Sequence, residues 1–379
     1  MQYKVTALTP LLVGDGRELS PIDYMVWKDQ VNVLDQARIF RLLARGPRLE
    51  GYLNQLRKAT KLDFASWGGF AQNFSQRRIP FESAEMTAIW NAAPSESLFI
   101  PTFAAETRGG YLPGSALKGA LRTGLVFSRW SAATIEKVAS SVEERLPRRL
   151  ADPAEANAAA SQIKVVGAAD SQNVPASAFK IYLTRTASLD TRQAGKPQLA
   201  WKIAGRGSVS GQRAADATPV FAEMAVPGTT FSGDWLERRF FENPELARAL
   251  GWRSAPDPKT IFDAANEFAA AHLALDARYA EMAGLDQVHA AVSRLQNELA
   301  ATREKPLACL VALGWGAGFL SKAGFLDTEL AAYRKILRAV PAIGKSLREN
   351  APFPKTRRVL FLSNQPATLP GWVRLELDK

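Results

Sequence analysis

The chain has 379 residues, of which 47% are hydrophobic and 22% charged, the composition of a globular protein with a sizeable core. Its 48 Lys and Arg outnumber its 37 Asp and Glu, and a net charge of +11 points to a polyanion, with nucleic acid as the first candidate and an anionic membrane surface as the second. A single cysteine excludes a disulfide within the chain, and the longest apolar stretch, residues 307–320, is too short to span a bilayer.

The first half of the chain alternates short strands with helices. Apolar patterning predicts a strand over residues 2–13 and a hairpin over 22–28 and 31–34. The other expected elements are helices at 36–44 and 48–61, an insertion or long loop at 62–95, a strand at 98–106, a helix from 113 to about 130, and more helix to about 155.

An Ala-, Asn- and Ser-rich stretch at 152–162 is the best candidate for a domain boundary. Beyond it the expected elements are strands at 179–189, 198–204, 221–226 and 229–236, a helical region at 258–303, a glycine-rich segment at 314–324, a helix at 328–340 and a strand at 372–377. The pattern predicts an α+β fold of two RRM-like (ferredoxin-like) units with helical insertions. The N-terminal domain is expected at 1–155, and a C-terminal domain with the helical insertion and the glycine-rich loop at 156–379.

The segment 111–123 is the most informative one. Pro113, Gly114 and Ser115 predict a helix start, with the Ser115 side chain as a cap and free backbone N–H groups that attract phosphate. Small residues at 119, 120 and 124 are expected to let this helix lie close to a sheet. The cations predicted to grip a nucleic-acid backbone are Arg108, Lys118, Arg122 and Arg129. The alternative is a solvated basic edge of a surface helix.

Alternating glycines mark a second segment. Gly314, Gly316 and Gly318 predict a loop whose backbone approaches a ligand closely, and Lys322 follows them. Trp315 is expected either to stack on bases or to anchor the loop.

The third segment is basic. Residues 334–374 carry nine Lys and Arg against one acid, Glu349. Lys355, Arg357 and Arg358 lie in a predicted loop before an apolar strand. We interpret this basic run as a binding site for a polyanion, with a solubilising surface as the alternative.

Catalytic chemistry is not evident in the sequence. The two histidines, His272 and His289, both lie in the helical region, and Asp15, Asp23 and Asp29 are expected to be scattered by the hairpin. We therefore expect no catalytic residue, no metal site and no cofactor.

Several segments resemble the RAMP superfamily of CRISPR-associated proteins. Tyr-Leu-Pro-Gly-Ser-Ala-Leu-Lys-Gly-Ala-Leu-Arg-Thr at 111–123 looks like its helix-start motif, Leu-Thr-Pro-Leu-Leu-Val-Gly-Asp-Gly at 8–16 like its first strand and turn, and Leu-Gly-Trp-Gly-Ala-Gly-Phe-Leu-Ser-Lys at 313–322 like its glycine-rich loop. Ser-Pro-Ile-Asp-Tyr at 20–24, Phe-Pro-Lys-Thr-Arg-Arg at 353–358 and Gly-Trp-Val at 371–373 are most similar to the branch that forms the fifth subunit of Csm-type (type III-A) complexes.

The resemblance implies an RRM-like RAMP fold and a non-catalytic subunit that binds guide RNA (crRNA). Such a subunit caps the backbone of a type III-A effector complex near the crRNA 3′ end and aids crRNA maturation in antiviral defence. The implied partners are crRNA and the repeated RAMP backbone subunit of the Csm complex, with the small helical subunit and host nucleases as further candidates. A cytoplasmic location without membrane contact is expected.

Two alternatives stay open. The first is a RAMP endoribonuclease or backbone subunit that cleaves guide precursor or target RNA. The family's backbone subunit uses an Asp in a loop, whereas Asp23 leads directly into a predicted strand, and no His precedes residue 272. The second alternative is a protein-interaction subunit that never touches RNA.

Overall fold

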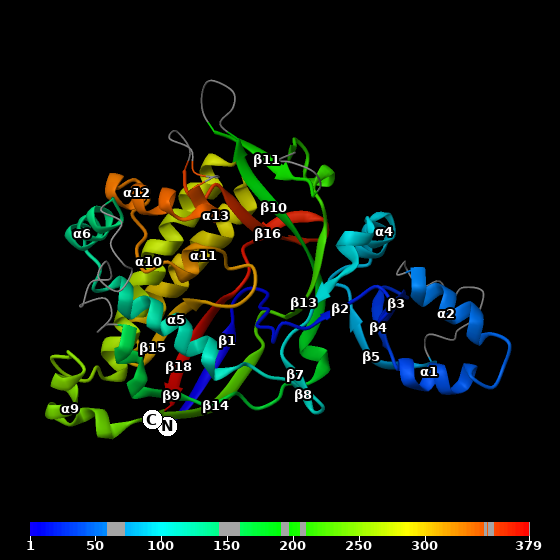
Figure 1. Cartoon of the computed structure of the whole chain (residues 1–379), viewed down its shortest axis with the longest axis horizontal. Helices are drawn as coiled ribbons and strands as arrows, with labels where there is room; N and C mark the ends of the chain where they lie inside the picture. Colours follow the sequence, from blue (N-terminus) through cyan, green and yellow to red (C-terminus); the bar gives the residue numbers. More distant parts are fainter. Residues whose placement is uncertain are drawn as a thin grey trace.

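The first of two large sheets is antiparallel and has β1 at its centre (Figure 1). The computed structural model describes residues 1–58, 73–143, 160–190, 197–204, 210–344, 347 and 352–378. Across the first sheet the strands are β15 (Ala308–Ala312), β18 (Trp372–Asp378), β1 (Gln2–Ala7), β14 (Thr230–Glu237) and β9 (Val166–Ala168). This sheet takes strands from both sides of the boundary predicted at residue 155, and the two-domain division there stays a prediction.

The second sheet is built around one long strand. Its order is β12 (Ser210–Gly211), β11 (Gln198–Lys202), β10 (Phe179–Asp190), β16 (Thr356–Leu362) and β17 (Gln365–Thr368), with β13 (Val220–Ala225) also paired to β10. Four predicted strands are confirmed, since each of their ends lies within two residues of an observed strand end; they were predicted at 179–189, 198–204, 221–226 and 229–236. Both sheets are antiparallel and accompanied by helices, which confirms the predicted α+β class.

The helices of the body gather on one side of the first sheet (Figure 1). They are α5 (Gly114–Phe127), α6 (Ala132–Glu143), α9 (Pro244–Ala249), α10 (Pro258–Met282), α11 (Asp286–Arg303), α12 (Ala331–Ala339) and α13 (Pro341–Gly344). The helical region predicted at 258–303 is two helices, because Gly284 turns the chain with a φ of +62°. None of the helices in the described ranges is long and apolar enough to cross a membrane.

Helix α5 packs against α10 through a glycine. A Cβ placed on Gly124 would lie 2.8 Å from the Cα of Ala265, so a side chain there would force the two helices apart. The expected close approach therefore occurs against a helix rather than a sheet. Leu117, Leu121 and Leu125 bury the same face of α5 in the main core, which leaves the opposite edge available for binding.

A smaller lobe extends from one side of the body (Figure 1). It contains β3 (Tyr24–Trp27), β4 (Gln30–Leu34), β5 (Ser75–Pro80), α1 (Gln36–Leu43), α2 (Leu49–Lys58) and α4 (Glu85–Ala92). The predicted hairpin and the helix predicted at 36–44 are confirmed. An ion pair between Arg77 and the fully buried Glu223 fastens the lobe to the second sheet.

Of the insertion or long loop predicted at 62–95, the long loop is wrong for the described part, which holds β5 and α4; residues 59–72 lie outside the described ranges. The strand predicted at 98–106 is wrong as well. Short two-residue strands replace it: β6 (Ile100–Pro101) pairs with β2 (Glu18–Leu19), and β7 (Ala105–Glu106) pairs with β8 (Gly109–Gly110). Pro101 has no N–H to continue a ladder, which limits the length of β6.

Candidate nucleic-acid interface

The start of α5 is closed by a carboxylate. The N–H of Gly114 donates to Oδ1 of Asp170 at 2.8 Å, and Pro113 occupies the N-cap position. The prediction that Ser115 caps the helix is wrong, since the N-cap is Pro113 and Ser115 is the second residue of the helix. Gly114 is buried, and a Cβ there would lie 2.2 Å from the carbonyl oxygen of Ala168. Because Asp170 repels a phosphate at this end, the exposed edge further along α5 is the better RNA-binding candidate.

The four cations predicted around α5 lie in different places. Arg122 is exposed and lines a groove beside the helix. Lys118 is half-buried, and burial, followed by the nearby charge of Arg238, lowers the pKa of its ammonium group. Arg129 is exposed just beyond the end of α5, and Arg108 is exposed in the turn between β7 and β8. Only Arg122 of these four is among the residues that line the groove.

The glycine-rich loop packs against two other segments, at Leu12 and at Pro370. All three of its alternating glycines have a positive φ: Gly314 at +74°, Gly316 at +91° and Gly318 at +78°. The N–H of Trp315 donates to the carbonyl of Leu12 at 2.7 Å. A Cβ on Gly314 would lie 2.1 Å from that same carbonyl oxygen. These glycines are therefore required by backbone conformation and, at Gly314, also by the close approach of another chain segment.

Substitution of two of these glycines by alanine should separate the two requirements. Gly318→Ala should cost roughly 1 kcal/mol of unfolding free energy, because its φ is positive but nothing lies within 4 Å of the added Cβ. Gly314→Ala should cost clearly more, since it must also displace the Leu12 carbonyl. Urea unfolding followed by tryptophan fluorescence measures both, and equal costs would mean that the loop is not seated on Leu12.

The groove lies between α5, the glycine-rich loop and residues 12–18, with a volume of about 700 Å³. The residues of α5 that line it are Ala116, Gly119, Ala120, Arg122 and Thr123, and those of the loop are Gly314, Trp315, Ser321 and Lys322. Arg122 and Lys322 are both exposed, and neither forms an ion pair with another residue in the described part of the chain. Two cations 200 positions apart in the sequence thus line one concave surface together with an aromatic ring.

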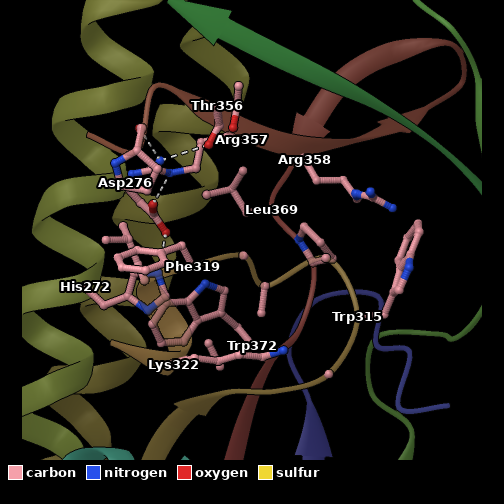
Figure 2. A pocket seen from close by; sticks show the side chains of 18 of the residues that line it. His272, Asp276, Trp315, Phe319, Lys322, Thr356, Arg357, Arg358, Leu369 and Trp372 are labelled. Atoms are coloured by element: carbon pink, nitrogen blue, oxygen red, sulfur yellow. Dashed lines mark hydrogen bonds and ion pairs between the residues drawn. The ribbon is translucent and has the colours of Figure 1, made fainter. Parts of the chain in front are cut away.

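A second cavity, of about 380 Å³, lies on the other side of the loop. Figure 2 shows Arg358 and Trp315 on one side of it and His272, Asp276 and Arg357 on the other. The guanidinium of Arg358 stacks on the Trp315 ring, 3.7 Å from the centroid. Trp315 therefore anchors the loop through Arg358 and also lines both hollows.

Two arginines of the basic C-terminal run form ion pairs within the protein. Nε of Arg357 lies 2.7 Å from Oδ1 of the buried Asp276, and its Nη1 donates to the Pro354 carbonyl at 2.9 Å. Arg374 pairs with Glu298 and Glu376. Ion pairs within the protein neutralise the charges of these two arginines, which argues against a part for them in the polyanion site predicted for this run. Lys345 and Arg348 lie outside the described ranges, as does Glu349.

Lys355 precedes β16, and its carbonyl oxygen accepts hydrogen bonds from the N–H of Leu189 and the hydroxyl of Tyr279. Its side chain lines neither the groove nor the second cavity. RNA contact by Lys355 stays a prediction. Arg357 and Arg358 both line the second cavity, which lies behind the glycine-rich loop. Of these two arginines, Arg358 is the one without an ion-pair partner among the described residues.

The candidate catalytic residues make separate structural contacts. Asp23 accepts hydrogen bonds from the Ser20 N–H at 2.7 Å and from the Gln36 amide at 3.0 Å, just before β3. Asp15 pairs with Arg17, and Asp29 accepts from the Thr87 hydroxyl. Within the described ranges, no three His, Cys, Asp or Glu side chains gather as metal ligands would. The three aspartates therefore make three separate structural contacts, and that of Asp29 reaches α4.

The sequence profile of the RAMP superfamily matches residues 4–233, and the chain belongs to this superfamily. Over its full length it is 21% identical to the "CRISPR system Cms protein Csm5" of Methanocaldococcus jannaschii, of which it covers 89%. Two solved structures share the fold. One is a chain of a Csm–crRNA–target RNA ternary complex from a type III-A CRISPR–Cas system, with a TM-score of 0.63 at 19% identity, covering 99% of this chain and 100% of that one. The other is Csm5 of T. onnurineus, with a TM-score of 0.58 at 18% identity, covering 98% and 99%.

Proposed function

We propose that this chain is a non-catalytic, guide-RNA-binding subunit of a type III-A CRISPR–Cas effector complex, that it caps the backbone near the crRNA 3′ end, and that it aids crRNA maturation. The observation that carries the proposal is the groove, where Arg122 and Lys322 face the same hollow beside Trp315. Exposed cations next to an aromatic ring suit a single-stranded backbone with stackable bases. The likeness to Csm5 proteins and to a chain of a Csm–crRNA complex supports the assignment to that assembly.

The proposed partners are crRNA and the repeated RAMP backbone subunit, with the small helical subunit and host nucleases as further candidates. Such a complex works in the cytoplasm. The first experiment is to purify the chain from its host under mild conditions and to identify the proteins and RNA that accompany it. A CRISPR effector complex with a guide RNA is the expected result; recovery without any RNA supports the protein-interaction alternative instead.

Binding without cleavage separates this proposal from a RAMP endoribonuclease. We expect labelled guide precursor to be bound and recovered intact after incubation with the purified chain and Mg²⁺, because the candidate aspartates are engaged in separate structural hydrogen bonds. Denaturing gels measure cleavage. Products that disappear with Asp23→Asn, in a variant that still folds and binds RNA, would establish the nuclease in place of the binding subunit.

A further inference from the structure

The cavity behind the glycine-rich loop is next to the groove but is a separate space. Gly314, Trp315 and Lys322 line both hollows, so the loop forms the wall between them. At about 380 Å³ the cavity falls in the range of small-molecule sites, and it is far too small for a folded partner or a length of RNA strand.

The walls of the cavity combine flat, charged and hydroxyl groups. Arg358 stacked on Trp315 presents a planar surface of the kind on which bases stack. Lys322 adds a second cation, and Thr186 and Thr356 lie in the wall. Phe319, Leu369 and Trp372 make the remaining wall apolar. An inorganic anion would leave the aromatic and apolar walls uncovered, and an apolar ligand would leave the two cations unpaired.

Two side chains of the wall also carry buried polar atoms without a hydrogen-bond partner. They are Nδ1 of His272, a residue 3% exposed, and Nη1 of Arg358. Burial lowers the pKa of the His272 imidazole, and its Nε2 lies 3.4 Å from the Asp276 carboxylate. A neutral imidazole that donates from Nε2 to Asp276 has an acceptor at Nδ1. Both atoms lie beneath the surface of the cavity, so the side chains must shift before a ligand can complete their hydrogen bonding.

We propose that this cavity binds one nucleoside monophosphate unit, with its base against the Arg358–Trp315 surface and its phosphate near Lys322. The inference rests on the proposed function, since the groove would bring the RNA to the other side of the same loop. The unit is either the end of the strand or a nucleotide turned out of it, and both present the same chemistry to the walls.

Titration of the full chain with uridine 5′-monophosphate, followed by calorimetry, tests the cavity directly. We expect saturable binding in the range of about 1 mM or tighter, and much weaker binding of ribose 5-phosphate and of inorganic phosphate. Arg358→Met should weaken uridine monophosphate binding by about tenfold or more, because it removes the cation and the stacking plane. Phosphate binding as tightly as the nucleotide, or no nucleotide binding up to about 10 mM, would overturn the proposal.

Matched variants separate this site from the groove. Arg122 lines the groove and not the cavity. Arg122→Gln should therefore weaken oligouridylate binding without changing the affinity for the mononucleotide. Thr356→Val removes a single hydroxyl from the cavity wall. It replaces Arg358→Met as the cavity variant if the unfolding midpoint of Arg358→Met shows that this variant does not fold. Oligouridylate binding that depends on Arg122, together with no binding of the mononucleotide, rejects the cavity and leaves the RNA-binding function standing. Binding of the mononucleotide, together with oligouridylate binding that does not depend on Arg122, rejects RNA binding in the groove.

Displacement by linear and circular oligouridylate then identifies the source of the unit. If both forms displace the bound mononucleotide, an internal nucleotide enters the cavity. If only the linear form does, the strand end enters. If both bind the chain and neither displaces the mononucleotide, the cavity does not serve RNA and the proposal fails.

Discussion

Replacing Arg122 and Lys322 together with glutamine should lower the affinity for single-stranded RNA by about 25-fold at 0.1 M salt. Each phosphate contact on a single strand contributes about 0.7 to the slope of log affinity against log salt concentration, so losing two contacts removes roughly 1.4 from the slope. Both side chains are exposed and line the groove, so glutamine should leave the fold intact. Fluorescence anisotropy with a labelled oligouridylate at four or five salt concentrations measures affinity and slope at once.

The matched control removes two other exposed cations. Arg248 lies on α9 and Arg253 shortly after it, and neither lines the groove. The variant Arg248→Gln with Arg253→Gln has the same net charge as the groove variant and should bind RNA nearly as the parent does. Equal losses in both variants would show that RNA responds to net charge alone and that the groove has no special part in binding.

Asp276→Asn should lower the free energy of unfolding by roughly 3 kcal/mol, since it leaves the guanidinium of Arg357 buried without its counter-charge. The carboxylate is 3% exposed, contacts Arg357 at 2.7 Å and lies 3.4 Å from His272. The ion pair between Asp276 and Arg357 joins α10 to the start of β16, and residues of both elements line the cavity behind the glycine-rich loop. Urea unfolding followed by tryptophan fluorescence measures the loss.

The same helix supplies the control for this effect. Asp263 of α10 pairs with Lys259 on the exposed surface of the helix, so Asp263→Asn should leave the unfolding midpoint almost unchanged. Adding Arg357→Met to Asp276→Asn should restore part of the lost stability, because the unpaired charge is then gone as well. A double variant no more stable than Asp276→Asn would mean that packing, rather than the unpaired charge, accounts for the loss.

Local patterning was enough to predict much of the fold. The strands at 179–189 and 372–377 and the helix from 113 follow from apolar periodicity and from Pro–Gly turns, which act over a few residues. The missed elements are the ones that depend on distant partners. β5 forms because it pairs with β4, and the two-residue strands β2 and β6 exist only as a pair.

The groove shows the same division between local and distant information. The sequence identifies Arg122 and Lys322 separately, each from its own motif, but only the fold brings helix α5 and the glycine-rich loop to one surface. Arg357 shows the reverse case. A cluster of basic residues reads as a binding site until a carboxylate from α10, 81 positions away, is seen to neutralise one of them. Asp170 likewise closes the helix start from 56 positions away.

The most direct test of the central claim is photo-crosslinking of the assembled, RNA-containing complex, followed by mass spectrometry of the modified peptides. We expect RNA adducts on the α5 edge around Arg122 and on the loop that contains Trp315 and Lys322. Adducts confined to other surfaces, with these residues covered by a neighbouring protein and no RNA near them, would contradict this claim.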